Sequence, residues 1–177
     1  MTKGALIVGA GTGISASFVR LLAKEGYKIV LASRDPGKLE RLARETLLIL
    51  SYGGFLVAQA ATRRMLPKGR GTILLTGASA SVKGYPQSAV FAMGKFALRG
   101  LAQSLARELS PKGIHVTHFV IDGSVRNSAR GRTETADMAP DSYLDPDAIA
   151  QAYLDVMRQH RSAWTWEIEL RPWVERF

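Results

Sequence analysis

The stretch from Ala5 to Ser17, ALIVGAGTGISAS, decides which fold this chain can adopt. An apolar run of strand length breaks into Gly9, Gly11 and Gly13, and a helical pattern follows. Glycines between a strand and a helix are typical of phosphate-binding α/β sheets, because the backbone can approach a pyrophosphate at the positive end of the helix. The strict G-x-G-x-x-G spacing is not met, since Ile14 occupies its last position. The alternative is a turn that only packs the helix on the strand.

The same alternation of strand and helix continues along the chain. We expect strands in residues 5–10, 27–33, 71–78, 114–123 and 162–170 and helices in residues 15–26, 36–45, 47–67, 86–110 and 145–160. Asp145 and Pro146 form a start signal for the last helix. Strands alternating with helices imply an α/β fold, a Rossmann-like doubly wound parallel sheet of about five strands. We expect one domain, residues 1–177.

The composition excludes several classes of site. The chain has 177 residues and no cysteine, which excludes disulfides and thiolate metal sites. His115 and His118 lie in an apolar run, so we expect a structural role for them and no metal site. The net charge is +9, but the Lys and Arg residues are scattered, and we expect no nucleic-acid partner. No stretch reaches the length of a membrane span, so we expect a cytoplasmic protein without a membrane partner.

The end of the second expected strand, LASRDPGKLERL, bears on the choice of nucleotide. An acidic residue at this place binds a ribose 2′-hydroxyl, whereas an Arg accommodates a 2′-phosphate. Ser33 and Arg34 come first and Asp35 follows, so we interpret Asp35 as a helix cap and Arg34 as the phosphate contact. This favours NADP over NAD. A solvated Arg34 without a ligand is the alternative.

At this point the chain resembles the short-chain dehydrogenase/reductase family. The resemblance rests on VGAGTGI near the start, ASRDPGKLERLARE after the second strand, GGFLVAQAATRRMLPKGRGTILLTGASAS, the helix that carries Lys95, and GIHVTHFVIDG. Members of this family are NAD(P)-dependent oxidoreductases that move hydride between nicotinamide and an alcohol or carbonyl. The resemblance implies the following cofactor-binding residues: Gly9, Gly11, Thr12, Gly13, Ile14, Ser33, Arg34, Lys95 and Gly123.

The resemblance fails at most of the family's catalytic tetrad. Lys95 matches the family lysine, which contacts the nicotinamide ribose and lowers the pKa of the catalytic tyrosine. The tyrosine position is Phe91, the serine position is Ala78, and the asparagine position is Leu50. This pattern looks like a divergent subgroup of the family, in which enzymatic activity is an open question.

The missing phenol has a large expected cost. A phenol gives a proton to the forming alkoxide, and the loss of such general acid catalysis costs about 10²- to 10⁴-fold in rate. The loss of the serine hydroxyl removes a donor to the developing oxyanion, about 10²-fold or more. Ser79 is a poor substitute for Ala78, because neighbours on an extended segment point apart. Tyr85 is the nearest phenol in sequence, and a surface loop is the simpler interpretation of it.

The chain is also shorter than the resemblance implies. Family members place two further βα units between the segments that end at Glu45 and begin at Leu47 here, which is about 60 residues at about 30 residues a unit. Without them the first strand can pair directly with the strand at 71–78. The strand order would then be 2-1-3-4-5, which keeps every crossover right-handed.

Two hypotheses follow from these patterns. The first is a divergent NADP-binding oxidoreductase with weak or unconventional hydride chemistry on a small carbonyl or alcohol. The second is a catalytically inactive scaffold or binding protein, and the resemblance implies a homodimer or homotetramer in either case. The arginines of the polar loop either select an anionic substrate or are solvated; they are Arg126, Arg130 and Arg132. The tryptophans of the last strand serve either an interface or the core; they are Trp164 and Trp166.

Overall fold

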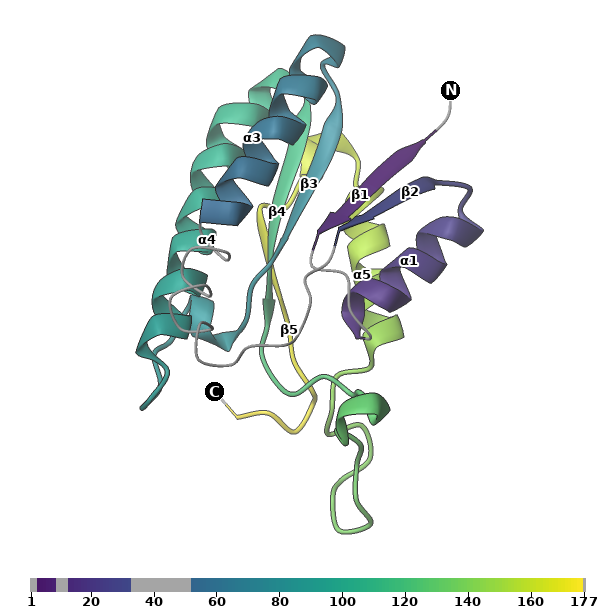
Figure 1. Cartoon of the computed structure of the whole chain (residues 1–177), viewed down its shortest axis with the longest axis vertical. Helices are drawn as coiled ribbons and strands as arrows, with labels where there is room; N and C mark the ends of the chain where they lie inside the picture. The colour runs from purple at the N-terminus through teal and green to yellow at the C-terminus, as the bar shows by residue number, and fades with distance from the viewer. Residues whose placement is uncertain (1–2, 9–12, 33–51, 177) are drawn as a thin grey trace. The chain divides into compact units, whose positions relative to one another are not determined.

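The computed structural model of the chain describes residues 3–8, 13–32 and 52–176 (Figure 1). The chain divides into two compact units, and each is described by itself. The first unit comprises Met1–Gly37, Gly123–Arg158 and Arg171–Phe177. The second unit comprises Lys38–Asp122 and Gln159–Leu170. The prediction of a single domain stays a prediction.

The first unit holds two parallel strands and two helices. Strand β1 (Gly4–Val8) pairs with β2 (Lys28–Ala32), and Leu6 lies opposite Val30. Helix α1 (Ile14–Lys24) packs against α5 (Pro146–Met157), and the rings of Phe18 and Tyr153 meet edge to face at 5.5 Å. Each helix therefore buries its apolar stripe on the other, as helical periodicity predicts.

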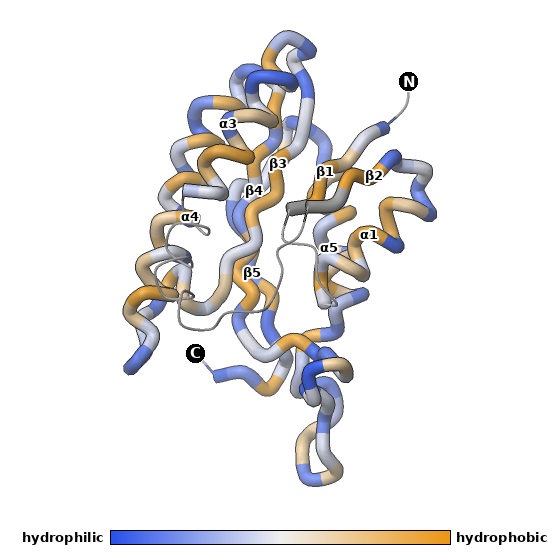
Figure 2. The backbone as a smooth tube through the Cα atoms, in the orientation of Figure 1, coloured by the Kyte–Doolittle hydropathy of each residue, from blue (hydrophilic) through white to orange (hydrophobic). Residues whose placement is uncertain are grey.

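The second unit holds a three-stranded parallel sheet with the order β3-β4-β5, formed by Gly71–Thr76, Ile114–Ile121 and Glu167–Leu170. All eight residues of the central strand β4 are buried. Helices α3 (Gly54–Met65) and α4 (Ala89–Leu109) lie side by side, and they contact β3 and β4 respectively (Figure 1). Both strands are predominantly hydrophobic (Figure 2). Such continuous apolar runs are expected of strands covered on both faces.

Short 3₁₀ helices connect these elements. They are Leu66–Lys68, Ser79–Ser81, Ser110–Lys112, Ser128–Arg130 and Arg161–Ala163. Two of them end at Gly69 and Gly113, both in the left-handed conformation, and the chain then enters β3 and β4. An added Cβ at Gly113 would overlap the Gly69 carbonyl, so these two turns touch and set the start of the β3–β4 pair.

The expected fold class is confirmed as α/β with parallel Rossmann-like strands and helices. The ladders observed are β1-β2 and β3-β4-β5, so the expected neighbours are found within each unit. Pairing between the first strand and the strand at 71–78 is not among the ladders of the described residues and stays a prediction. The expected helix at 36–45 lies outside the described residues.

The last strand is shorter than its alternating pattern predicts. Strand β5 begins only at Glu167, and residues 161–163 form a 3₁₀ helix instead. The reason lies in the Thr165 carbonyl, which accepts a hydrogen bond from the Thr117 hydroxyl at 2.8 Å and lies 2.8 Å from His115 Nε2. Side chains of β4 therefore bind the backbone ahead of β5.

Within the described parts of the chain, no helix combines the length and apolar character required to span a membrane. The same residues contain no group of three His, Cys, Asp or Glu side chains arranged to hold a metal ion.

Candidate active site

The carboxyl end of β3 and the first turns of α4 place the tetrad positions that the structure describes. Ala78 follows β3 in an extended conformation, and its amide donates to the Ser81 hydroxyl at 3.1 Å. Phe91 and Lys95 lie one turn apart on α4, and the Lys95 Nζ is 5.7 Å from the centroid of the Phe91 ring. The sequence therefore predicted correctly that these two side chains are neighbours.

Lys95 is the buried cation of this region. Its side chain lies against the end of β3, where the ammonium donates a hydrogen bond to the Thr76 carbonyl at 3.0 Å, and the residue is only 8% exposed. No carboxylate forms an ion pair with Lys95 among the residues that the structure describes. Burial without a counter-charge disfavours the ammonium and lowers the pKa of Lys95 to about 8.

A hydrogen-bonded network from β4 and β5 lies on the sheet beneath α4. Glu167 accepts two hydrogen bonds from the Arg99 guanidinium, at 2.6 and 2.8 Å, and its carboxylate also lies 3.0 Å from Nδ1 of the buried His118. Arg99 and His118 hold the pKa of Glu167 below its usual range, and burial lowers the pKa of His118. Glu167 is half-buried, whereas Glu169, which alternates with it on the same strand, is exposed.

His115 packs elsewhere on the same strand. Its ring stacks on Trp164 at 4.7 Å with an interplanar angle of 2°. This stack agrees with the expected structural role of His115 and with the packing alternative for Trp164. Trp166 is 36% exposed and lies under the Arg99 guanidinium.

Gly77 allows the network of Glu167 and His118 to approach the end of β3 closely. A Cβ added there would lie 2.6 Å from both His118 Cε1 and Ser81 Oγ, so only glycine fits beside these two buried side chains. The His118 Nε2 atom faces the same point and has no hydrogen-bond partner among the described residues. Sequence reasoning missed this packing and the Ser81 contact, because neither follows from periodicity along one strand.

The glycine turn is described only at its end. Gly13 is the N-cap of α1, no side chain caps this helix, and its first turn has no acidic residue. An added Cβ at Gly13 would be 3.6 Å from Asn127 Nδ2, which is an ordinary contact. The start of α1 therefore presents backbone amides and Ile14, which suits an anion. The other predicted contacts lie outside the described residues: Gly9, Gly11, Thr12, Ser33, Arg34 and the tetrad position Leu50.

Gly123 follows β4, where the resemblance implies a cofactor contact. Its φ is +147°, a conformation that L side chains rarely adopt, and an added Cβ would lie 2.7 Å from Pro172. The glycine is therefore required by the backbone itself. The structure adds no contact that assigns Gly123 to a ligand.

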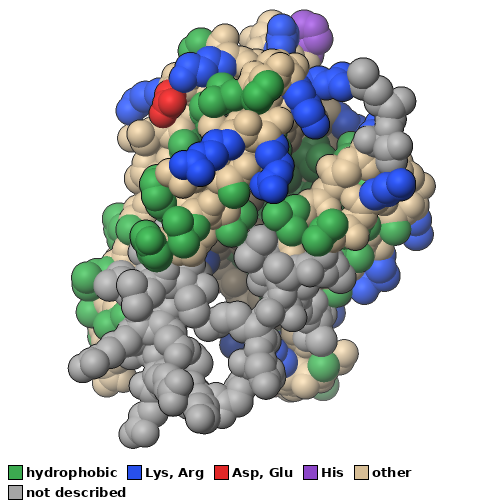
Figure 3. Space-filling view, turned by 45° about the horizontal axis from the view of Figure 1, so that its top comes forward, with side chains coloured by type: hydrophobic (Ala, Val, Ile, Leu, Met, Phe, Trp, Pro, Cys, Tyr) green, Lys and Arg blue, Asp and Glu red, His purple; other side chains and the backbone are tan. Residues whose placement is uncertain are grey.

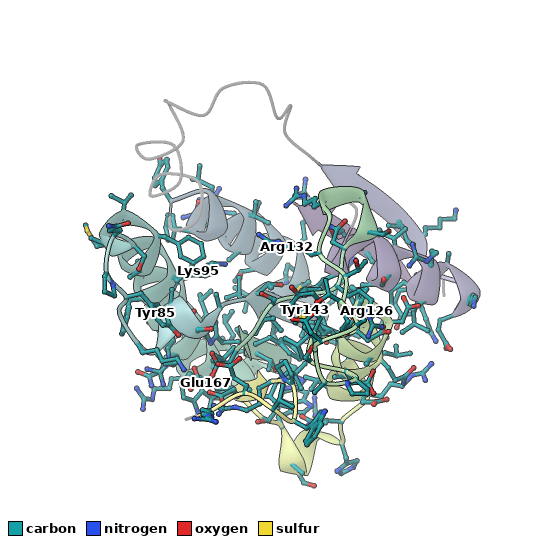
Figure 4. All side chains as sticks on the ribbon, turned by 90° about the horizontal axis from the view of Figure 1, so that it is seen from below. Tyr85, Lys95, Arg126, Arg132, Tyr143 and Glu167 are labelled. Carbon is teal, nitrogen blue, oxygen red and sulfur yellow. The ribbon has the colours of Figure 1, made fainter. Side chains whose placement is uncertain are left out.

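Arg126 lies in the hydrophilic loop between Gly123 and Asp145 (Figures 2 and 4). Its guanidinium binds Glu134 through two hydrogen bonds, at 2.7 and 3.0 Å, and Asp145 at 2.8 Å, and it lies 3.5 Å from Asp141. These partners raise the pKa of Arg126 and lower the pKa of Glu134 to about 2. Because Asp145 also caps α5, Arg126 anchors the loop to that helix. The guanidinium is therefore paired and is not a freely solvated charge, and the contact with an anionic substrate stays a prediction.

The loop before α4 carries a second paired cation. The ammonium of Lys83 binds the buried Asp122 carboxylate at 3.2 Å and lies 6.0 Å from the Tyr85 ring. Asp122 raises the pKa of Lys83. Tyr85 is 45% exposed, in agreement with the surface-loop interpretation. Figure 4 shows Tyr85, Lys95 and Glu167, which all belong to the second unit.

The surface charge of the described residues is spread out. Lys and Arg side chains lie over much of one face of the molecule with hydrophobic side chains between them (Figure 3). Helix dipoles favour cations at helix C-termini, and several basic residues lie in the last turn of α3 or α4 or in the 3₁₀ helix that follows: Arg63, Arg64, Lys68, Arg107 and Lys112.

Comparison with known proteins identifies the family that shares this arrangement. A family model described as short chain dehydrogenase matches residues 44–136. An uncharacterized oxidoreductase of Staphylococcus aureus strain N315 is 24% identical over 228 residues, which span 96% of this chain and 97% of the relative. A short-chain dehydrogenase from Rhodopseudomonas palustris has a TM-score of 0.76 at 29% identity and covers 97% of this chain and 99% of its own.

A third protein shares the fold at lower identity. An alcohol dehydrogenase from Thermococcus sibiricus, complexed with 5-hydroxy-NADP, has a TM-score of 0.80 at 18% identity and covers 99% of both chains.

The length of the first alignment bears on the expected gap. It has 228 positions, at least 51 more than the 177 residues of this chain, although both proteins align almost from end to end. The additional positions therefore lie inside the chain of the relative. The family model begins to match at residue 44, beside the place where about 60 residues were expected to be missing.

Proposed function

The chain belongs to the short-chain dehydrogenase family, and we propose that it is an NADP-dependent oxidoreductase that moves hydride slowly to or from a small carbonyl or alcohol. The slowness follows from Phe91 and Ala78, which supply neither the phenol nor the hydroxyl that the family uses. The proposed reaction is that of the family, but it proceeds without the family's usual proton donor, the tyrosine phenol.

One observation carries the proposal, namely the position of Lys95. A lysine that served only the surface would point into solvent, because a buried ammonium is costly. Here the side chain is buried against the end of β3 with a single described acceptor, the Thr76 carbonyl. Retaining such a group is expected where it contacts a ligand, since perturbed pKa values cluster at functional sites.

Each unit, taken by itself, offers groups that suit one part of a dinucleotide. In the first unit, the start of α1 has Gly13 as its N-cap and no capping side chain, which suits a pyrophosphate. In the second unit, Lys95 has further N–H donors for ribose hydroxyls. The bound dinucleotide would supply or accept the hydride. NADP is preferred to NAD on the ground of Arg34 alone, and the NADP analogue bound by the Thermococcus sibiricus enzyme agrees with that preference.

The direct test is titration of the protein with NADPH and NADH, followed by a survey of carbonyl turnover. We expect binding of NADPH in preference to NADH and slow turnover of an activated carbonyl such as an aromatic 1,2-dione. The double substitution Ala78→Ser/Phe91→Tyr restores both missing donors and should raise turnover by about 10²-fold or more. Absence of binding at saturating NADPH would refute the proposal.

A second candidate function is supported by the exposed apolar residues of α3 and α4. Six hydrophobic side chains on these helices are 39–57% exposed: Phe55, Leu56, Val90, Phe91, Met93 and Phe96. Exposed apolar groups in this number indicate an interface. A homodimer or homotetramer that binds a partner without catalysis would use this surface. It predicts an oligomer by light scattering and no turnover even in the Ala78→Ser/Phe91→Tyr variant.

A further inference from the structure

Lys95 has properties that a lysine acting only as a ribose contact does not need. Its ammonium is buried, faces a phenyl ring and binds a neutral carbonyl. We propose that Lys95 itself exchanges the proton with the carbonyl oxygen, in place of the phenol that Phe91 lacks. This inference rests on the proposed function and deepens it, because it names the proton donor of that site.

The geometry leaves Lys95 with donors to spare. An ammonium has three N–H groups, and one of them is used by the Thr76 carbonyl at 3.0 Å. The ring of Phe91 lies 5.7 Å from Nζ, so Lys95 lies next to the position from which the family donates its proton.

Two described carboxylates of the second unit are paired with other cations. Glu167 is held by Arg99 and His118, and Asp122 is held by Lys83. Their negative charges are therefore shared with neighbours, and the charge of Lys95 is not balanced by either. The result is an ammonium that loses its proton more readily than a surface lysine.

An ammonium that loses its proton readily suits general acid catalysis. An acid is most effective when its pKa lies near the working pH, and burial lowers the pKa of Lys95 to about 8. Lys83 is a poorer candidate, because Asp122 raises its pKa. The arginines do not lose protons at all under these conditions.

The step balances with NADPH as the hydride donor, which would be oxidised to NADP⁺. As its hydride reached the carbonyl carbon, the C=O π electrons would move to oxygen and one N–H bond of Lys95 would break as the O–H bond formed. The substrate is reduced to the alcohol, Lys95 is left as a neutral amine, and water from the solvent returns its proton. In the oxidative direction the neutral amine accepts the hydroxyl proton as hydride leaves the carbon.

The pH dependence of the reduction rate follows from the protonation of Lys95. The charged and titratable side chains on the elements around Lys95 include Arg99 on α4, His118 on β4, Glu167 on β5, Lys83 in the loop before α4, and Asp122 after β4. Glu167 and Asp122 are paired, and the arginine does not titrate. Reduction requires the ammonium, so its rate should be level below pH 8 and fall about tenfold per pH unit above it.

The first test measures the proton on Lys95 without any turnover. The protein is labelled with [¹³Cε]lysine, and the signal of Lys95 is assigned as the one lost in Lys95→Arg. We expect this signal to titrate near pH 8, below the ordinary range of a lysine side chain. A Lys95 signal that titrates above pH 10 would overturn the inference and leave the proposed function standing.

The second test uses the pH profile of NADPH oxidation with an aromatic 1,2-dione. Lys95→Arg keeps the positive charge but has no proton to give, so turnover should fall about 10²-fold or more while NADPH still binds. Adding Phe91→Tyr to Lys95→Arg should recover at least tenfold of the loss. Lys112→Arg, on the exposed Glu108–Lys112 pair, is the matched control and should turn over like the natural protein.

The outcomes separate the inference from the function on which it rests. Unchanged turnover in Lys95→Arg, or no recovery on adding Phe91→Tyr, would overturn only the role of Lys95 as proton donor. Turnover that appears only in Ala78→Ser/Phe91→Tyr would identify a disabled enzyme and would also overturn it. Absence of NADPH binding by the natural protein would overturn the inference and the proposed function together.

Discussion

Two cations of this protein lie in opposite surroundings. Arg126, in the loop of the first unit, binds the carboxylates of Glu134 and Asp145. Lys95, at the end of β3 in the second unit, binds only the Thr76 carbonyl among the described residues. The guanidinium is 32% exposed and paired, whereas the ammonium is buried and unpaired by any described carboxylate.

The difference indicates which of the two charges serves the fold. A charge with several partners stabilises the loop that it joins to α5, and its position needs no other explanation. A buried charge without a counter-ion destabilises the fold, because its desolvation is not offset. Such a group is retained where it contributes to function, and proteins commonly lose stability at functional sites.

The largest expected effect comes from removing the charge of Lys95. In Lys95→Met, turnover with NADPH and an aromatic 1,2-dione should fall about 10²-fold or more, because the proton donor is lost. The free energy of unfolding should rise by about 1 kcal/mol, since a buried ammonium is replaced by an apolar chain of similar length. Urea denaturation and initial rates measure the two changes. A lower free energy of unfolding with unchanged turnover would mean that Lys95 serves the fold and not the reaction.

The next largest effect tests the packing behind Lys95. Gly77→Ala would place a Cβ 2.6 Å from His118 Cε1 and Ser81 Oγ, and His118 is held by Glu167. We expect a loss of about 1–3 kcal/mol in the free energy of unfolding, measured in urea. Gly84→Ala is the matched control, because an added Cβ there meets nothing within 4 Å. Equal stabilities of the two variants would show that the end of β3 is loosely packed.

A smaller effect is expected from the paired cation. Arg126→Met should lower the free energy of unfolding by about 1 kcal/mol, because Glu134 and Asp145 lose their partner. Arg132→Met, in the same loop, is the control and should stay within about 0.5 kcal/mol of the natural protein. A stability of Arg126→Met at or above that of the control would mean that the ion pairs do not anchor the loop.

The smallest expected effect is the pH dependence of the free energy of unfolding. Lys95 is responsible for its change at alkaline pH, and Glu134, the partner of Arg126, for its change at acid pH. The folded-state pKa of Lys95 is lowered to about 8, so its destabilising effect is present below pH 8 and is relieved as the pH rises from 8 to 10.5. The folded-state pKa of Glu134 is lowered to about 2, so its stabilising effect is present above pH 4.5 and is lost as the pH falls toward 2.

Urea unfolding at a series of pH values should therefore show two separable changes. Lys95→Met should remove the alkaline rise, and Arg126→Met should weaken the acid decline. If Lys95→Met left the alkaline rise intact, another group would be responsible for it.

Local patterns predicted the elements of the fold well. The cap of α5 at Asp145 is confirmed, and its carboxylate accepts from the amides of Asp147 and Ala148. The neighbourhood of Phe91 and Lys95 followed from their spacing on one helix. Strand β4 followed from an apolar run alone.

Contacts between distant segments could not be predicted from the sequence. Glu167 alternates with apolar residues like a solvated side chain, yet Arg99, 68 residues away, and His118, 49 residues away, bring it into a network. Arg126 meets its partners through the folding of one loop, which no periodicity encodes. The burial of Lys95 against the Thr76 carbonyl is likewise a contact between separate segments, which a list of residue types cannot show.

The most direct test of the account follows the hydride itself. The natural protein would be incubated with saturating NADPH that carries deuterium at both C4 positions and with an aromatic 1,2-dione, and the product alcohol would be analysed by mass spectrometry. The account predicts one deuterium on the carbinol carbon of the product, formed slowly and at least about 10²-fold more slowly still by Lys95→Met. Absence of labelled product from the natural protein, with NADPH bound, would contradict it.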